Sequence, residues 1–196
     1  MLRLIVLLVS FFVVNGCAKP GTSQTAPPPQ QTSTAASSPQ LKPKLDACAM
    51  LTSEEIQSVQ GEAVKEARLS ESSANGLRVS QCFFSLPTFT NSISLVITQK
   101  ADGPGARDPK QFWKDTFHSS KQRNDDDREK EEGEARPPQK VSGIGDEAFW
   151  MTSPAAGILY VLKGSSYIRI SIGGGGDQQT KIGKSKALAR KVIDRL

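Results

Sequence analysis

The predicted β-strands come in two runs, and short turns join the strands within each run. The first run has three members, at residues 62–70, 77–85 and 91–100. The second run also has three, at residues 146–152, 158–163 and 166–172. The Asn75-Gly76 pair in the first run favours the two-residue turn of a β-hairpin. Strands linked in this way pair antiparallel, so we expect one antiparallel sheet of about six strands in two three-strand runs.

The pattern within residues 91–100 indicates how such a sheet is buried. Ile93, Leu95 and Ile97 alternate with polar residues. Successive side chains of a strand point to opposite faces of the sheet. We therefore expect these three residues on a buried face, and Ser92, Ser94 and Thr98 on a face that contacts water.

Three helices are predicted to flank the sheet. Thr52 and Glu55 form a capping-box pattern that begins a helix at residues 53–60, and Gly61 suits its end. Asp108-Pro109 begins a second helix, with Phe112, Trp113 and Phe117 as its buried edge. Asp177 caps a last helix, whose apolar stripe comprises Ile182, Ala189, Val192, Ile193 and Leu196. The expected fold class is therefore α+β, a single sheet flanked by three helices.

The first 16 residues are typical of a secretory signal peptide. A positive start at Arg3 precedes an apolar run over residues 4–14. A helix of that length spans roughly 16 Å, too little to cross a bilayer. The Val14-Asn15-Gly16-Cys17 sequence that follows resembles a bacterial lipobox, which predicts a thioether-linked lipid on Cys17 and anchoring by two or more acyl chains. The alternative is an ordinary secreted protein in which Cys17 stands there by chance.

Composition changes after the lipobox and changes again near Leu45. Residues 18–44 contain six prolines among Ser, Thr, Gln and Ala, with one Leu and no aromatic residue. Such a segment cannot bury enough apolar surface to offset its ordering entropy, so we expect residues 17–44 to form a lipidated, disordered tether. Residues 45–196 are expected to form a single globular domain.

Two cysteines remain once Cys17 is lipidated. An exported chain meets oxidising conditions, and we expect Cys48 and Cys82 to form a disulfide there. Closing a loop of about 35 residues stabilises a fold by roughly 4 kcal/mol in the chain-entropy model. The alternative, a reactive or metal-binding pair, is disfavoured by the wide spacing and the lack of a Cys-x-x-Cys motif.

The chain has no GxSxG, HExxH or SxxK motif, and we expect no catalytic residue, metal or cofactor. Its one histidine, His118, is interpreted as a surface or core residue of the second helix. Asp146 and Glu147 are adjacent on a strand, so they point to opposite faces and make a poor carboxylate pair.

Two further segments offer weaker alternatives to this interpretation. The acidic run at residues 124–132 has alternating carboxylates that suit calcium, but it lacks the glycine and the distant glutamate of an EF-hand. The glycines at residues 173–176 precede a helix and could cradle a phosphate. The nearby Gly183-Lys184-Ser185 falls inside that helix, so a flexible connector is the preferred reading.

Positive charge gathers near the C-terminus. Residues 178–196 carry six basic side chains against the single acidic Asp194, a local net charge of +5. The basic residues are Lys181, Lys184, Lys186, Arg190, Lys191 and Arg195. They predict contact with anionic envelope lipid or polymer. The alternative is a solvated basic face, since cations suit a helix C-terminus. No nucleic-acid partner is expected for an exported chain.

Several motifs together suggest a family. They are the lipobox, the tether, DACAMLTSEEIQSVQG at residues 46–61, QCFF at 81–84, VSGIGDEAFW at 141–150 and ILYVLKG at 158–164. The combination resembles small bacterial lipoproteins that carry a domain of unknown function, whose members look like the PsbP-like α+β fold. The resemblance implies structural roles for Cys48, Cys82 and the Gly145-Asp146-Glu147 turn, and it implies no known activity.

These features predict an exported, lipid-anchored protein of the cell envelope, held at the membrane through the lipid on Cys17. Because no convergent polar groups are apparent in the sequence, we expect a non-catalytic binding or interaction module for an envelope ligand, polymer or protein. The alternative is an unfamiliar enzyme that acts on envelope lipid or glycan, using Asp, Glu, Tyr160 or Tyr167. A purely structural role is a third possibility.

Overall fold

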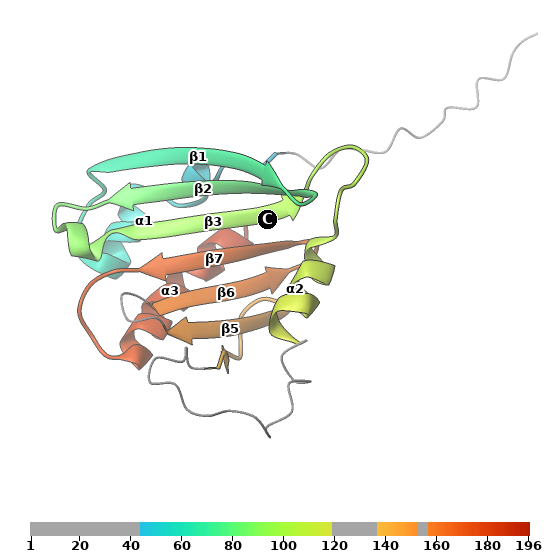
Figure 1. Cartoon of the computed structure of the whole chain (residues 1–196). Helices are drawn as coiled ribbons and strands as arrows, with labels where there is room; N and C mark the ends of the chain where they lie inside the picture. Colours follow the sequence, from blue (N-terminus) through green and yellow to red (C-terminus); the bar gives the residue numbers. More distant parts are fainter. Residues whose placement is uncertain (1–43, 119–136, 153–156) are drawn as a thin grey trace, which may run out of the picture. The chain divides into compact units, whose positions relative to one another are not determined.

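Seven strands form one antiparallel sheet, in the order β1-β2-β3-β7-β6-β5-β4 (Figure 1). The computed structural model describes residues 44–118, 137–152 and 157–196, which belong to one compact unit. The strands are β1 Glu66–Ala74, β2 Leu77–Ser85, β3 Ile93–Lys100, β4 Gln139–Lys140, β5 Glu147–Thr152, β6 Gly157–Lys163 and β7 Ser166–Ile172. The helices are η1 Ala47–Met50, α1 Ser53–Gln60, η2 Phe89–Asn91, α2 Pro109–Phe117 and α3 Gln178–Ile193, where η denotes a 3₁₀ helix.

The expected α+β class, single antiparallel sheet and three α-helices are confirmed for the part of the chain that the structure describes. The expected count of about six strands is wrong, because β4 makes a seventh. This strand has two residues, paired with Phe149 and Trp150 of β5. A strand of two residues has no hydrophobic period from which it could be predicted.

The three α-helices begin where their capping residues predict. Thr52 accepts a hydrogen bond from the backbone of Glu55, whose carboxylate accepts from the backbone of Thr52, so the capping box of α1 is complete. Gly61 ends α1 in the left-handed region, at φ 86°. The side chains of Asp108 and Asp177 accept hydrogen bonds from the backbone at the starts of α2 and α3, and so cap the N-termini of these helices.

One face of the sheet, here called the inner face, packs against η1, α1 and α3. Ile93, Leu95 and Ile97 of β3 lie on it with at most 1% of their surface exposed, as the alternation predicts. Three isoleucines of β7 continue this layer. From α3 the layer receives Leu188, a fully buried residue that the expected stripe omits. Leu196, which the stripe included, lies beyond the end of α3 and is 39% exposed.

The opposite face, here called the outer face, packs against α2. Trp113 and Phe117 of α2 contact Phe149 of β5 and Leu162 of β6. The expectation that Ser92 and Thr98 face water is wrong. Ser92 is 9% exposed, and its hydroxyl accepts from the backbone of Leu86. Thr98 is 2% exposed. Its partner across the strands is Tyr167, which packs against the cluster under α2, so this end of the face is covered. Ser94, near the other end of β3, is half-buried.

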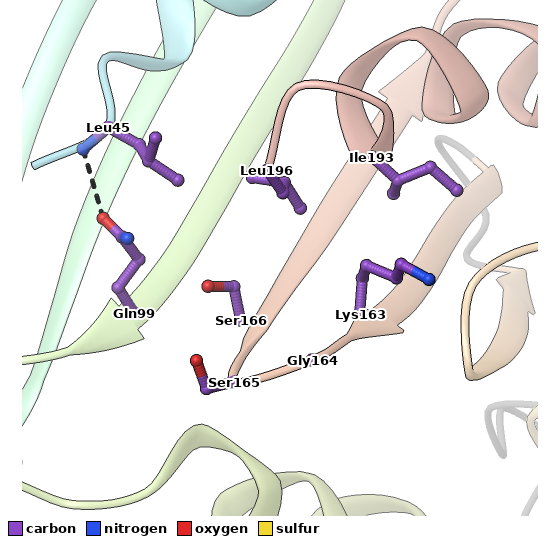
Figure 2. Close-up of a pocket in the computed structure, with 8 residues that line it drawn as sticks. All are labelled: Leu45, Gln99, Lys163, Gly164, Ser165, Ser166, Ile193 and Leu196. Atoms are coloured by element: carbon purple, nitrogen blue, oxygen red, sulfur yellow. Dashed lines mark hydrogen bonds between the residues drawn. The ribbon is translucent and has the colours of Figure 1, made fainter. Parts of the chain in front are cut away.

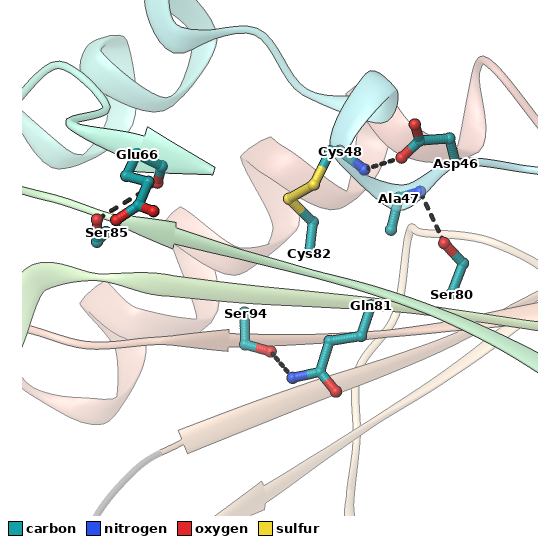
Figure 3. Close-up of a disulfide and its surroundings, with 9 residues drawn as sticks. All are labelled: Asp46, Ala47, Cys48, Glu66, Ser80, Gln81, Cys82, Ser85 and Ser94. Carbon is teal, nitrogen blue, oxygen red and sulfur yellow. Dashed lines mark hydrogen bonds between the residues drawn. A yellow bond between two sulfur atoms is a disulfide. The ribbon is translucent and has the colours of Figure 1, made fainter. Parts of the chain in front are cut away.

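The expected disulfide joins Cys48 of η1 to Cys82 of β2, with 5.0 Å between their Cα atoms (Figure 3). Cys82 is fully buried on the inner face. Beside the disulfide, the backbone N–H of Ala47 donates to the hydroxyl of Ser80 at 3.0 Å. The covalent bond and this hydrogen bond hold the start of the domain on β2.

Several predicted features fall outside the described residues. These are the signal peptide at 1–16, Cys17 with most of the tether, and the charged run that contains the calcium alternative. Among the residues that are described, no helix has the length and apolar character needed to span a bilayer.

Candidate functional site

The outer face has a hollow beside the region that α2 covers. This hollow, here called the face pocket, has a volume of about 470 Å³. It is lined by Phe83, Phe89, Thr90, Ser92, Ser94, Ser171, Gly173, Gly174, Gly175 and Lys181. Pockets that bind small ligands have about 300–1,000 Å³. The face pocket is therefore large enough for one.

The floor of the face pocket is set by strand register. Phe83 of β2 lies opposite Ser94 of β3, and Ser94 lies opposite Ser171 of β7. Residues paired across an antiparallel sheet point to the same face. The three side chains therefore form one row on the outer face. The hydroxyl of Ser94 accepts a hydrogen bond from the side chain of Gln81 at 3.3 Å.

Arg169 adjoins this floor. It lies on β7 two residues before Ser171, so its side chain leaves the same face about 7 Å away. The residue paired with Arg169 on the neighbouring strand β3 is Val96. The Nε atom of Arg169 is buried, and no described residue accepts a hydrogen bond from it. A buried donor without an acceptor is uncommon in proteins, because its desolvation is not compensated.

Two aromatic rings form one wall of the face pocket. The ring centroids of Phe83 and Phe89 are 6.0 Å apart, with an interplanar angle of 50°. Phe89 is 72% exposed, the highest value among the large apolar side chains that the structure describes. Solvent exposure of a phenylalanine on a short 3₁₀ turn is unfavourable by itself. The exposed position of Phe89 leaves one face of its ring free beside the polar floor.

The turn that carries Phe89 is held by hydrogen bonds from several elements. The carboxylate of Glu62 accepts from the backbone of Thr88 at 2.7 Å and from the side chain of Asn91 at 2.5 Å. These two donors lower the pKa of Glu62 below its ordinary value. Gln60 of α1 donates to the carbonyl groups of Asn91 and Gly173, at 2.6 and 3.3 Å. The rim of the pocket is therefore fixed before any ligand binds.

The glycine run after β7 allows this close approach. A Cβ at Gly173 would collide with the carbonyl oxygen of Thr90, and Gly174 has φ +95° beside Asn91. Only glycine fits both positions without strain. The carboxylate of Asp177 accepts from the backbone of Thr180 at 2.7 Å, so the N-terminus of α3 already holds a negative charge. This arrangement disfavours the phosphate cradle, and it shows a packing role for the glycines.

A second hollow of about 400 Å³, here called the end pocket, lies between the start of the domain and the β6-β7 turn (Figure 2). Leu45, Ile193 and Leu196 are its apolar side chains, and the backbone of Leu45 donates to Gln99 at 3.2 Å. Gln99 and Ser165 both have further partners. Because these polar groups are already engaged, the end pocket is the weaker candidate.

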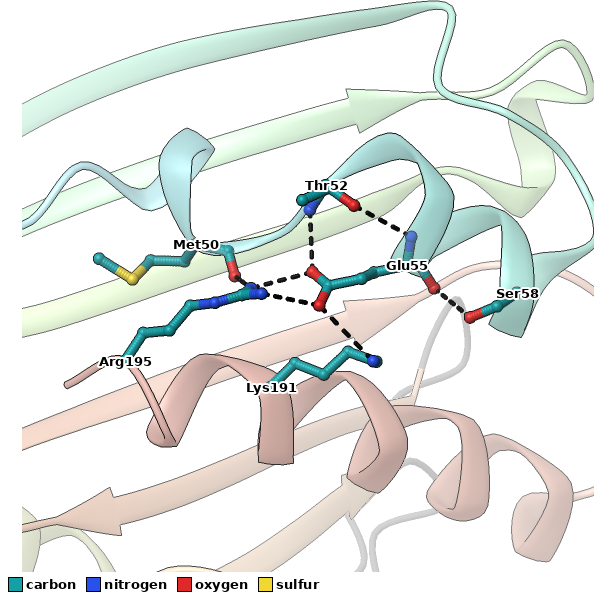
Figure 4. A network of polar contacts seen from close by, with 6 residues as sticks. All are labelled: Met50, Thr52, Glu55, Ser58, Lys191 and Arg195. Carbon is teal, nitrogen blue, oxygen red and sulfur yellow. Dashed lines mark hydrogen bonds and ion pairs between the residues drawn. The ribbon is translucent and has the colours of Figure 1, made fainter.

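Four of the six basic residues predicted on the last helix contact other parts of the fold. Arg195 donates to both carboxylate oxygens of Glu55, at 2.9 and 2.7 Å, and to the carbonyl oxygen of Met50 (Figure 4). Lys191 approaches Glu55 to 3.5 Å. The hydrogen bond from Arg195 lowers the pKa of Glu55 to about 2. This cluster fastens the end of α3 to the start of α1.

The remaining basic residues divide into two groups. Lys184 donates to Gln60 at 3.1 Å, and Lys186 donates to the carbonyl oxygen of Ser142 at 2.8 Å. Within the described part of the chain, no hydrogen bond or ion pair engages the side chains of Lys181 and Arg190. Lys181 is the one that lines the face pocket.

The Gly145-Asp146-Glu147 turn makes contacts that hold neighbouring parts of the sheet. Gly145 has φ +60°, and a Cβ there would collide with Val161. The carboxylate of Asp146 accepts from the backbone of Gly164 at 2.8 Å and so holds the β6-β7 turn. Asp146 also lies 3.6 Å from the ammonium group of Lys163.

Glu147 fastens α2 to the sheet. Its carboxylate accepts a hydrogen bond from the indole of Trp113 at 2.7 Å and lies 2.8 Å from Nε2 of His118. Burial alone raises the pKa of Glu147, but the hydrogen bonds from Trp113 and His118 outweigh it, so this pKa lies below its ordinary value. His118 thus ends α2 in a structural contact, and Asp146 and Glu147 do not share a site.

The two tyrosines of the enzyme alternative lie in the aromatic cluster under α2. The rings of Tyr160 and Phe117 are 5.3 Å apart, and Tyr167 stacks on Phe112 at 5.9 Å. Burial raises the pKa of Tyr167. A tyrosine with a raised pKa is less readily ionised and is a poorer nucleophile at neutral pH.

Sequence reasoning missed the residues of the face pocket other than Lys181 and the glycines. One signal was available, because Arg169 is the only charged residue in the segment 166–172. Phe89, between two threonines in a turn, was a second. Ser94 and Ser171 carry no signal, since serine is ordinary on a half-exposed strand.

In the described ranges, no group of three or more His, Cys, Asp or Glu side chains is placed to hold a metal ion. Comparison with known proteins finds no matching family model, no matching curated protein and no matching solved structure.

Proposed function

We propose that this chain is a lipid-anchored protein of the cell envelope whose domain is a non-catalytic binding module, with the face pocket as its binding site. The observation that carries the proposal is a preformed hollow that joins an exposed aromatic ring to serine hydroxyls and the ammonium group of Lys181. Phe89 is exposed on a turn that three hydrogen bonds with Glu62 and Gln60 hold in place. Such a turn is stabilised without a ligand, and it presents a ring that contributes nothing to the core.

The location rests on the sequence. The apolar run, the lipobox at Cys17 and the tether together suit export and anchoring, and the resemblance to small bacterial lipoproteins agrees with them. A tether of this composition spans roughly 30–80 Å, so the domain can reach ligands away from the bilayer surface. Weak contact with anionic lipid would be made by Lys181 and Arg190, because the other basic residues predicted on the last helix have partners within the fold.

Cross-linking in living cells tests the binding site without assuming a ligand. Phe89 is replaced by photoreactive benzoylphenylalanine, and in a matched control the same residue replaces Leu69. Leu69 is also an exposed apolar residue, at 46%, but it lies on β1 away from the face pocket. We expect adducts from position 89 and none from position 69. Equal adducts from both positions, or none from position 89, would contradict the proposal.

A separate test addresses the anchor. Cys17→Ser removes the thiol that the lipid requires, so we expect unprocessed or released protein, whereas the wild type stays in the membrane fraction. Mass spectrometry of the wild-type N-terminus measures the acyl chains directly. Wild-type protein that is unlipidated and free in the medium would contradict the anchor and leave the binding site untouched.

A further inference from the structure

The face pocket combines three kinds of group that one ligand class would use together. The first is the free face of Phe89, held at an angle to Phe83. An aromatic face attracts the C–H edges of an apolar or alicyclic ring, because its π-electrons carry a partial negative charge. The turn is braced by Glu62 and Gln60, so little ordering of Phe89 is required when a ring stacks on it.

The second kind of group is the pair of hydroxyls on the floor. Ser94 and Ser171 lie directly opposite each other on β3 and β7. A hydroxyl both donates and accepts, so two of them side by side suit a ligand that itself carries several hydroxyls. A purely apolar ligand would leave the hydroxyl of Ser171 without a partner and that of Ser94 with Gln81 alone, which is unfavourable.

The third kind is unpaired positive charge. Lys181 lines the pocket, and Arg169 adjoins it on β7; within the described residues, no hydrogen bond or ion pair engages the charged group of either. None of the described lining residues is acidic. Glu62 is on the rim and Asp177 caps α3 one turn before Lys181, but both carboxylates already accept hydrogen bonds within the fold. A carboxylate or phosphate of a ligand would give these charged groups a partner, and charge-assisted hydrogen bonds are the strong ones.

From these three observations we propose that the face pocket binds an anionic saccharide, a sugar ring that carries a carboxylate or a phosphate. This inference rests on the proposed function, since it names the ligand class of the same pocket. The sugar ring stacks on Phe89, its hydroxyls meet Ser94 and Ser171, and its anionic groups reach Lys181 in the pocket and Arg169 beside it. The exposed position of Phe89 suits an internal ring of a polymer as well as a single sugar.

Calorimetric titration of the purified, detergent-solubilised full chain tests the ligand class with four probes. Tetragalacturonate carries carboxylates, glucose 6-phosphate carries a phosphate, maltotetraose is neutral, and glycerol 3-phosphate has an anionic group without a sugar ring. We expect at least one of the two anionic sugars to bind ten-fold or more tightly than both maltotetraose and glycerol 3-phosphate. Its affinity should fall with added salt, because charge carries part of the binding.

Variants locate the binding. Arg169→Gln and Phe89→Ala should each weaken the anionic sugar about ten-fold, and Arg169→Lys should recover part of the loss. The matched control is Arg190→Gln, which changes the net charge equally at an exposed position that does not line the pocket. It should leave the affinity within two-fold. Circular dichroism and the thermal midpoint confirm that each variant is folded, and the Phe89 variant keeps the test valid if Arg169→Gln does not fold.

Two results would overturn the saccharide inference. One is equal affinity for the neutral and anionic sugars, or for glycerol 3-phosphate and the sugars. The other is an affinity that Phe89→Ala and Arg169→Gln leave unchanged. If position 89 cross-links in cells while no anionic sugar binds, the ligand class is wrong and the binding module remains. If position 89 does not cross-link, the proposed function itself is wrong.

Discussion

The two faces of the sheet are built from the same strands but are covered very differently. The inner face is aliphatic and is closed by η1, α1 and α3, with the Cys48–Cys82 disulfide at its edge. Among the described residues, α2 is the helix that covers the outer face, through a small aromatic cluster around Trp113. A nine-residue helix is about 14 Å long, whereas seven strands span about 29 Å.

The difference shows that the surface available for binding lies on the outer face, beyond α2. Helix α2 is too short to cover the whole outer face. In the described structure, the part that α2 leaves carries serine, arginine and phenylalanine side chains instead of a second aliphatic layer. We therefore expect changes on the inner face to affect stability, and changes at the face pocket to affect binding with little effect on stability.

The largest effect is expected from removal of the disulfide. Cys48→Ala with Cys82→Ala should lower the free energy of unfolding by about 4 kcal/mol, because the unfolded chain regains the freedom of a loop of about 35 residues. Urea denaturation with and without a reducing agent measures the loss. Reduction of the wild type should have a similar effect. A loss below about 1 kcal/mol would show that the disulfide does not hold the inner face together.

A pair of isoleucine variants compares the two faces directly. Ile170 of β7 is fully buried on the inner face, and Ile158 of β6 is half-buried on the outer face. Ile170→Ala should lower the free energy of unfolding by about 3 kcal/mol, whereas Ile158→Ala should lower it by about 1 kcal/mol. Urea denaturation of both variants checks the ratio. Equal losses would contradict the contrast between the faces.

The attachment of α2 should depend on Trp113. Trp113→Phe keeps an aromatic ring but leaves the carboxylate of Glu147 without its indole donor, which should lower the free energy of unfolding by about 2 kcal/mol. Hydrogen exchange should become faster in α2 and stay unchanged in α3. The half-buried Phe112 serves as control, since Phe112→Leu should lower the free energy by less than about 1 kcal/mol. Unchanged exchange in α2 would mean that Glu147 does not fasten it.

The ion pair between α1 and α3 predicts a dependence on pH. The folded pKa of Glu55 is about 2, against an ordinary value of 4.5, so its contribution is complete above pH 4.5 and is lost as the pH falls toward 2. Glu55→Gln keeps the capping box and removes the charge. It should lower the free energy of unfolding by about 1 kcal/mol at pH 7.

Denaturation of the Glu55 variant at pH 7 and at pH 2 supplies the check, and the two proteins should converge at pH 2. Glu54→Gln is the control, because Glu54 lies in the same helical turn but has no arginine partner. A pH-independent difference between wild type and Glu55→Gln would refute the ion-pair interpretation.

The smallest effect on stability is expected at the face pocket. Phe89→Ala should change the free energy of unfolding by less than about 0.5 kcal/mol, because the ring is 72% exposed. The thermal midpoint measures this. A destabilisation above about 1 kcal/mol would assign the ring to the core and would remove the contrast with Ile170.

Much of the local structure was predictable from particular residues. Thr52 and Glu55 mark the start of α1, and Gly61 marks its end. The Asn75-Gly76 pair forms the turn between β1 and β2 with positive φ at both residues. The disulfide followed from the parity of the cysteines. The site was not predictable in this way. Phe89, Ser94 and Arg169 are far apart in the chain, and none of them breaks a local rule strongly enough to suggest a pocket.

The sequence by itself determined the caps, the turns, the alternation within strands and the cysteine pair, because each depends on a few neighbouring residues or on counting. Only the tertiary structure decided that β3 pairs with β7, that α2 covers one end of the outer face, and that Leu188 is buried while Leu196 is not. Strand pairing between distant segments depends on which register buries the most apolar surface at once, and no local pattern encodes that comparison. The row of Phe83, Ser94 and Ser171 exists because the register of three strands brings it together.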